Sequence, residues 1–167
     1  FTKCKIIISC STFDFNGDAA QNVPAFIFNN LNISNKNAAS ATARTKTQTG
    51  IITINGNLNI DGYSASITTF QLGNFNFTVL GNTNVNDYGN LIDGGASTNI
   101  FTGPVLISLN GRWNVPQPST FRNGLTVNST FFTSGSSYTF DTNNQTIDGT
   151  QSITISNVIA TGITVTN

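Results

Sequence analysis

The stretch IITINGNLNI, residues 51–60, alternates apolar side chains with small polar ones around a central glycine. Alternation with a period of two is typical of a β-strand whose two faces lie in different environments. One face carries aliphatic residues, and the other carries threonine and asparagine. Gly56 falls where a strand bends or bulges. The stretch therefore predicts two short strands that meet at a corner.

The same pattern returns in FNFTVLGNTNV, residues 75–85, and in VLISLNGRWNV, residues 105–115. We align the copies on Gly56, Gly81 and Gly111, the second interval being somewhat longer than the first. The predicted inward positions are Ile52, Ile54, Leu58 and Ile60, then Phe75, Phe77, Val79 and Val85, then Val105, Ile107, Leu109, Trp113 and Val115. A unit with one apolar face cannot bury that face alone, whereas stacked copies bury a continuous core.

The repeat predicts an all-β fold, a right-handed parallel β-helix (solenoid), as one domain over residues 1–167. Helix is disfavoured because the chain has 25 Asn, 25 Thr, 15 Ser and 15 Gly, all poor formers of helix interiors. The alternative is an antiparallel β-sandwich with an N-terminal strand of the donor-strand type, since short strands and frequent turns are also typical of sandwiches.

The chain is almost uncharged, with 8% charged residues against roughly 25% in ordinary soluble domains. Its net charge is zero, so we expect no nucleic-acid partner. No stretch approaches the roughly 20 apolar residues of a membrane span. The chain begins with Phe1 rather than Met, which is expected of a processed product. This neutral polar composition favours an extracellular or cell-surface location.

Two segments depart from the repeat. Residues 35–50 lack large apolar side chains and contain three of the seven basic residues, so we expect an exposed loop there. Residues 1–12 are apolar and favour a strand, either the first strand of the domain or a segment that joins a neighbouring subunit.

Cys4 and Cys10 bracket three consecutive isoleucines. An extended strand would place the two cysteines about 20 Å apart, beyond the roughly 6 Å that a disulfide bridges. Three arrangements stay open: free buried thiols, an internal disulfide around a sharp bend, and disulfides to a neighbouring chain.

The segments YTFDTNNQTIDGTQSITISNVIATGITVTN (138–167), FIFNNLNISN (26–35) and GIITINGNLNIDG (50–62) resemble the degenerate β-strand repeats of large secreted surface proteins and adhesins of Bacteroidota. NGLTVNSTFFTSG (123–135) is also similar to runs in phage tail fibres. The resemblance implies an extracellular structural or adhesive role and carries no catalytic residues. It does not account for the N-terminal cysteines.

We expect no enzymatic activity, because the chain has no His and no Glu and its seven Asp lie mostly in turn-like contexts. Asp14, Asn16 and Asp18 alternate as at the start of an EF-hand loop and are the candidate calcium ligands. Position 19 is Ala instead of the expected Gly, and no Glu follows. A plain turn is the alternative, and no other cofactor is implied.

Surface glycans are the other ligands that the sequence suggests. Sequons mark Asn32, Asn76, Asn128 and Asn144 as candidate glycosylation sites, at no more than the frequency that chance gives this composition. Trp113 is either a sugar-stacking platform or a core residue, and its parity favours the core. Tyr63, Tyr88 and Tyr138 are further aromatic candidates for binding.

Together these features predict a non-enzymatic extracellular module that builds a surface filament or stalk and presents an adhesive surface. Self-association into a fibre or homo-oligomer is expected, end to end or by donor-strand exchange. The alternatives are a segment of a phage tail fibre or tailspike, and a carbohydrate-binding module.

Overall fold

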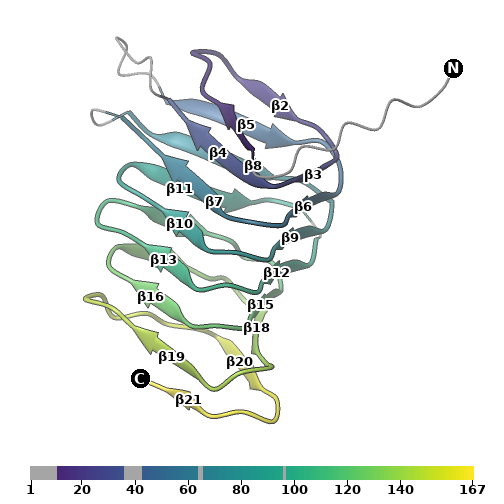
Figure 1. Ribbon diagram of the computed structural model, residues 1–167. Coiled ribbons are helices and arrows are strands. Elements are labelled where there is room, and N and C mark those ends of the chain that lie inside the picture. Colours follow the sequence, from purple (N-terminus) through teal and green to yellow (C-terminus); the bar gives the residue numbers. More distant parts are fainter. Residues whose placement is uncertain (1–10, 36–42, 64–65, 96) are drawn as a thin grey trace, which may run out of the picture.

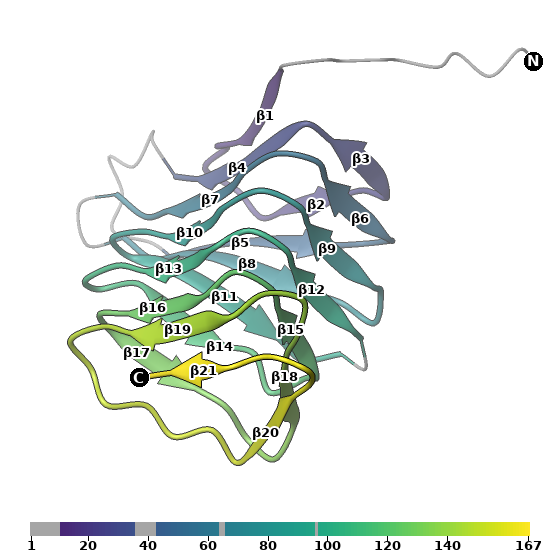
Figure 2. The same cartoon turned by 60° about the horizontal axis from the view of Figure 1, so that its bottom comes forward.

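The computed structural model of the chain describes residues 11–35, 43–63, 66–95 and 97–167. These residues contain strands and turns and no helix. They wind into a parallel β-solenoid of about seven turns, as Figures 1 and 2 show. Seen from its N-terminal end, the solenoid turns clockwise as the chain runs away from the viewer. The winding is therefore right-handed, as expected for crossovers between parallel strands. The predicted parallel β-helix is confirmed.

Three parallel sheets form the walls of the solenoid, and the coils contribute strands to them in the order A, B, C, except the last coil, which has no strand in sheet B. Sheet A contains β1 (Thr12–Phe15), β4 (Asn30–Ser34), β7 (Leu58–Asp61), β10 (Thr83–Val85), β13 (Val105–Ile107), β16 (Leu125–Val127), β19 (Gln145–Asp148) and β21 (Val165–Thr166). Sheet B contains β2 (Gln21–Val23), β5 (Arg44–Gln48), β8 (Thr68–Leu72), β11 (Gly89–Asp93), β14 (Arg112–Asn114) and β17 (Thr130–Phe132). Sheet C contains β3 (Phe26–Phe28), β6 (Ile52–Ile54), β9 (Phe77–Val79), β12 (Asn99–Phe101), β15 (Ser119–Phe121), β18 (Ser137–Phe140) and β20 (Asn157–Ala160).

The antiparallel β-sandwich is wrong, because the paired strands of the described residues all run parallel. An isolated antiparallel bridge joins Tyr63 and Ser66 within a turn. Coil length varies: Phe13 pairs with Leu31 and Leu31 pairs with Leu58, so the second of these coils is markedly longer than the first. Sheets of this kind need both partners of every ladder in place, so each coil is stabilised by its neighbours.

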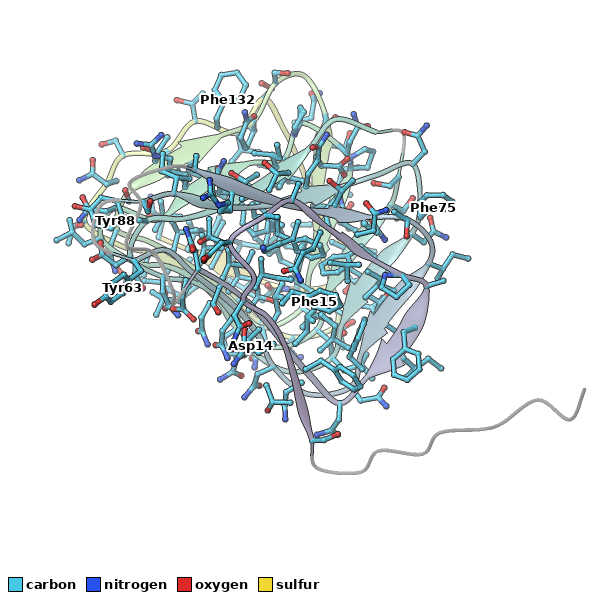
Figure 3. All side chains as sticks on the ribbon, turned by 90° about the horizontal axis from the view of Figure 1, so that it is seen from above. Asp14, Phe15, Tyr63, Phe75, Tyr88 and Phe132 are labelled. Atoms are coloured by element: carbon cyan, nitrogen blue, oxygen red, sulfur yellow. The ribbon has the colours of Figure 1, made fainter. Side chains whose placement is uncertain are left out.

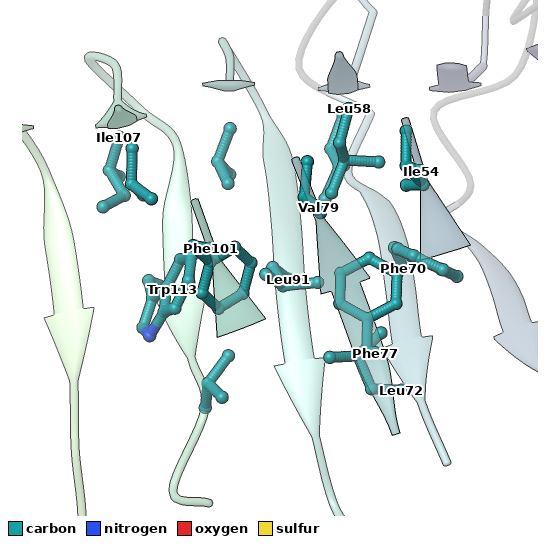
Figure 4. Close-up of a cluster of buried hydrophobic side chains, with 14 of the residues drawn as sticks. Ile54, Leu58, Phe70, Leu72, Phe77, Val79, Leu91, Phe101, Ile107 and Trp113 are labelled. Atoms are coloured by element: carbon teal, nitrogen blue, oxygen red, sulfur yellow. The ribbon is translucent and has the colours of Figure 1, made fainter. Parts of the chain in front are cut away.

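The inside of the solenoid is filled by rows of side chains in register. The inner row of sheet C contains Phe28, Ile54, Val79, Phe101, Phe121 and Phe140. The rings of Phe101 and Phe121 stack at 5.6 Å, and those of Phe121 and Phe140 at 5.4 Å. Figure 4 shows side chains of sheets B and C, among them Phe70, Leu91 and Trp113, filling the space between the walls. This continuous core is the burial that the repeat predicts.

The predicted inward positions are confirmed with two exceptions. Phe75 is 39% exposed and Leu109 is 70% exposed. Both follow a strand pattern in sequence but lie in turns at corners, just before β9 and just after β13. A corner rotates the chain, so parity counted from the strand no longer gives the direction of the side chain.

The third copy of the repeat is also out of phase with the first two. Gly103, and not Gly111, stacks on Gly81 and Gly56 at the corner between sheets C and A. Gly111 lies at the next corner, between sheets A and B, in line with Gly89. The coil that starts at β10 is shorter than the one before it, so the interval from Gly81 to Gly111 joins two different corners.

The exposed loop predicted for residues 35–50 is wrong for its second half. Residues 44–48 form β5, and Lys46 and Gln48 point into the solenoid. Asn35 is buried, and residues 36–42 lie outside the described part of the chain. The predicted N-terminal strand at 1–12 lies outside it except for residues 11 and 12, and Thr12 begins β1.

Candidate binding surface

The outward side of sheet A carries an array of carboxamides over three successive coils. We call this array the amide face; it consists of Asn30, Asn32, Asn57, Asn59, Asn82 and Asn84. Neighbouring strands lie about 4.8 Å apart, and residues two apart on a strand about 6.6 Å apart, so the amides form a regular lattice. The amide face confirms that the Asn rows predicted from the repeat point to water.

Two kinds of hydrogen bond fix the amide face. Asn59 donates from Nδ2 to Oδ1 of Asn32 across 3.1 Å, and Asn84 donates to Oδ1 of Asn59 across 2.8 Å. In the neighbouring row, Oδ1 of Asn30 accepts the backbone N–H of Asn57, and Oδ1 of Asn57 accepts that of Asn82. Each carboxamide has two N–H donors and two oxygen lone pairs, so the ladder fixes the orientation of the amides and leaves hydrogen-bonding capacity for a ligand.

The amide face ends at a corner that two coils reach with similar sequences. The segments NLNIDGY, residues 57–63, and NTNVNDY, residues 82–88, lie in register, with Leu58 on Thr83 and Ile60 on Val85. Gly62 donates its N–H to the carbonyl of Asp87, as expected when Gly62 lies on Tyr88, so the register shifts by one residue here and Tyr88 packs on Gly62. Figure 3 shows Tyr63 and Tyr88 at this one corner, away from Phe75 and Phe132. We call it the Tyr63–Tyr88 corner.

Carboxylates and amides pair across the coils beneath these tyrosines. Asn86 donates from Nδ2 to Asp61 across 2.6 Å, and Asn110 donates from Nδ2 to Asp87 across 2.8 Å. Both bonds run from one coil to the next, as in the amide face. The carboxylates are thus acceptors held in place by neutral amides, without a cationic partner in these bonds.

Tyr88 has a left-handed backbone conformation, with φ of +55°. A residue other than glycine pays about 1–2 kcal/mol to adopt it. Asn110, which occupies the same place in the next coil, has φ of +62°. Asparagine adopts this left-handed region more often than most other residues, whereas tyrosine adopts it rarely. The fold therefore holds the Tyr88 ring at the corner at a cost in backbone energy.

Trp113 and Tyr138 are core residues. Trp113 is 0% exposed and contacts Phe101 and Phe131, as its parity predicts. The prediction that Tyr138 is an exposed binding aromatic is wrong: its hydroxyl donates to the carbonyl of Val115 and accepts from Nε1 of Trp113. These two partners satisfy the polar end of the ring inside the solenoid.

Two buried charged groups were not predicted. Lys46, 0% exposed, donates from Nζ to the carbonyls of Gly17 and Ala19 at 2.6 and 2.8 Å. The carboxylate of Asp93 accepts from the backbone of Gly95 and the side chains of Ser97 and Asn99 within 2.9 Å. Lys46 is thus bonded to a neighbouring coil and Asp93 to its own turn, so both groups help to hold the fold together.

The candidate calcium ligands lie at the start of sheet A, where Asp14 and Asn16 are exposed at the end of β1. Asp14 accepts from the hydroxyl of Ser34 at 2.7 Å and from Nδ2 of Asn16 at 3.5 Å. Among the described residues, no three His, Cys, Asp or Glu side chains are grouped so as to hold a metal ion. Calcium binding at Asp14, Asn16 and Asp18 stays a prediction. Cys4 and Cys10 lie outside the described residues.

The asparagine side chains of the four sequons differ in their hydrogen bonds. Oδ1 of Asn32 accepts from Asn59, that of Asn128 from the backbone of Thr150, and that of Asn144 from the backbone of Thr164. Asn76 is exposed, and its side chain makes no hydrogen bond within the described part of the chain. Of the four, Asn76 is the site most open to a modifying enzyme.

Three surface depressions lie on the C-terminal half. The depression beside Pro104 and Gly124 has a volume of about 400 Å³ and is lined by one carboxylate, Asp148. Asp148 also borders the depression at residues 147–153, whereas the one beside Leu109 and Phe131 has no carboxylate in its lining. These depressions do not bring two carboxylates together, as acid–base hydrolysis of a glycoside requires.

Within the described residues, no helix has the length and apolar character needed to cross a membrane. Comparisons of the chain with protein-family models, with curated proteins and with solved structures give no match.

The register of the coils defines the class of the protein: the chain is a parallel β-solenoid protein with a carboxamide-lined face. The sequence signal of its corner is the pair of seven-residue segments that end in Tyr63 and Tyr88, which the alignment of Gly56 with Gly81 also superposes.

Proposed function

We propose that the chain is a non-enzymatic extracellular module that forms a rigid stalk or filament and presents an adhesive surface. The observation that carries the proposal is the unbroken stacking of about seven coils, each hydrogen-bonded to the next and filled by one continuous core. Bending such a solenoid requires breaking ladder bonds and core contacts together. A solenoid therefore serves well as a mechanical spacer.

The outside of the solenoid supports the same role. The amide face is neutral and hydrated, and its ladder uses side-chain bonds that run along the long axis. Because carboxamides are neutral, these contacts depend little on ionic strength. Such a surface suits a location where salt and pH are not controlled, which favours the extracellular or cell-surface setting.

Self-association is part of the proposal. A coil at the end of a solenoid has a neighbour on one side only, so its free backbone N–H and C=O groups allow a strand or coil from a second copy to continue the ladder. End-to-end stacking and donor-strand exchange both use these groups. The product is a filament with the same cross-section as the module.

The test is the assembly state across concentration, measured by light scattering after gel filtration and by negative-stain imaging. We expect filaments or end-to-end oligomers that lengthen as concentration rises. A fixed homotrimer would favour the phage-fibre alternative instead. Monomers at every concentration would overturn self-association.

A carbohydrate-binding module is the second candidate function. The specific observation in its favour is the Tyr63–Tyr88 corner, where the exposed Tyr63 and the half-buried Tyr88 stand beside ordered amides and carboxylates. This role is compatible with a stalk, because an adhesin needs both reach and a ligand.

A further inference from the structure

We propose that the Tyr63–Tyr88 corner, with the adjoining amide face, binds a neutral polysaccharide chain. The inference rests on the adhesive part of the proposed function and names its ligand. It combines three features of the same two coils: an exposed and a half-buried tyrosine, ordered amides, and the left-handed backbone of Tyr88.

The first feature is the pair of rings. Tyr63 is 53% exposed, and Tyr88 is half-buried in the next coil. No stacked or edge contact joins the two rings within the described residues, and the exposed part of Tyr63 is open to a ligand. Tyrosine combines an apolar ring face with a polar hydroxyl, which matches a sugar ring with its C–H face and hydroxyl edge.

The second feature is the array of hydrogen-bonding groups beside the rings. Asn59 and Asn84 have one N–H each in the ladder and a second N–H that points to no partner in that ladder. Asp61 and Asp87 add acceptors, each oriented by an amide of the next coil. Because the groups are already oriented, a ligand does not pay to order them.

The third feature is the conformation of Tyr88. Its φ of +55° is one that tyrosine rarely adopts, and the next coil solves the same turn with Asn110. Strained residues of this kind gather at ligand-binding sites, where the surroundings hold them in place. The turn itself does not need the ring, since Asn110 adopts the same conformation at this place in the next coil.

The chemistry of the corner disfavours polyanions as ligands. The carboxylates of Asp61 and Asp87 repel polyanions, and the amides that bond them bring no positive charge to the corner. A neutral polysaccharide offers hydroxyls at regular spacing and apolar ring faces. Both match the lattice of amides and the two tyrosines.

The test measures retention of the full chain in affinity gels that contain cellulose derivative, xylan, β-1,3-glucan, mannan, starch or soluble chitin derivative, with heparin as the charged comparison. We expect the native chain to be retarded by at least one neutral polymer and not by heparin. Retardation by none of the neutral polymers, or by heparin alone, would overturn the proposal.

The variants are chosen from the fold itself. Tyr88→Asn installs the residue that the next coil uses at this place, and Asn84→Leu installs the residue found in register at Leu106. Tyr63→Ala removes the other ring. We expect each of these variants to weaken binding of the retained polymer by about 2- to 12-fold, with a larger loss when the two tyrosine changes are combined.

Phe132→Ala is the matched control, because Phe132 is also 53% exposed but lies on sheet B. We expect this variant to bind as the native chain does. Equal losses in Phe132→Ala and in the tyrosine variants would overturn the assignment of the corner. The stalk proposal is judged separately by the assembly state, so loss of glycan binding with intact filaments would remove this inference alone.

Discussion

Gly81 donates its N–H to the carbonyl oxygen of Gly56 across 3.0 Å, at the corner where sheet C passes into sheet A. A Cβ atom on Gly81 would collide with that carbonyl, and one on Gly103 would collide with the carbonyl of Gly81. These glycines are required by close approach between coils. The corner therefore depends on a column of residues without side chains.

Gly81→Ala is expected to destabilise the fold, because backbone cannot move aside as a flexible side chain would. The expected loss is about 1–3 kcal/mol in the free energy of unfolding, as for overpacked cores. Urea denaturation followed by circular dichroism measures it. Gly94→Ala is the control, since a Cβ there has no atom within 4 Å. Equal stability of the two variants would contradict the role of the column.

The amide ladder gives a second prediction. Asn59→Ala removes the bond to Asn32 and the bond from Asn84, and we expect it to lower the free energy of unfolding by about 1–2 kcal/mol. Asn114→Ala, an exposed asparagine on sheet B, should have little effect. Combining Asn59→Ala with Asn84→Ala should cost less than the sum of the single losses, because both variants remove the same bond. Strict additivity would argue against the ladder.

Lys46→Met gives a third prediction. The variant removes a buried ammonium that donates to Gly17 and Ala19, and we expect a loss of roughly 1.5–3 kcal/mol at neutral pH. Burial lowers the pKa of Lys46 and the charge of Arg44 lowers it further, while Asp18 and Asp14 act in the opposite direction.

The lowered pKa sets the sign of the pH dependence. Between the pKa of the folded state and the usual 10.5, the unfolded chain binds more protons at this position, so the native chain gains stability relative to Lys46→Met as pH rises. Denaturation of both proteins from pH 8 to 10.5 measures the difference. A difference that stays constant over this range would show that Lys46 is not desolvated.

Much of the fold could be predicted from the sequence because burial in a solenoid follows parity. Ile52, Ile54, Leu58 and Ile60 are all fully buried, as alternation around Gly56 predicts. The phase of the third copy could not be predicted, since the coil from Thr83 to Val105 is shorter than the coil from Leu58 to Thr83. A spacing alone does not say which corner a glycine occupies.

Polar strands are the other limit on prediction. The pattern of β5 is RTKTQ, which contains no apolar side chain, yet Lys46 and Gln48 face the core. Their partners are backbone groups of neighbouring coils, such as the carbonyl of Asn76 for Gln48. Partners that are distant in sequence cannot be read from local composition. For the same reason the burial of Tyr138 could not be predicted, because the groups that satisfy its hydroxyl belong to Val115 and Trp113.

Tyr138 gives the last prediction. Burial raises the pKa of its phenol to about 12, outweighing the opposing hydrogen bond from Trp113. The unfolded chain loses this proton near pH 10, whereas the folded chain keeps it to about pH 12. The stability contributed by the neutral phenol is complete below pH 10 and is lost as pH rises from 10 to 12. The loss reaches up to about 3 kcal/mol, at about 1.4 kcal/mol for each pH unit.

Tyr138→Phe isolates this effect. At neutral pH the variant loses the hydrogen bonds to Val115 and from Trp113, so we expect it to be about 1–2 kcal/mol less stable than the native chain. Between pH 10 and 12 the native chain should lose its advantage, because the two proteins differ only in the Tyr138 hydroxyl. Urea denaturation of both proteins at pH 7, 10 and 11.5 measures the gap. A gap that remains unchanged to pH 11.5 would show that the Tyr138 hydroxyl is open to water, and the packing around Trp113 would then be looser than its stacked rings indicate.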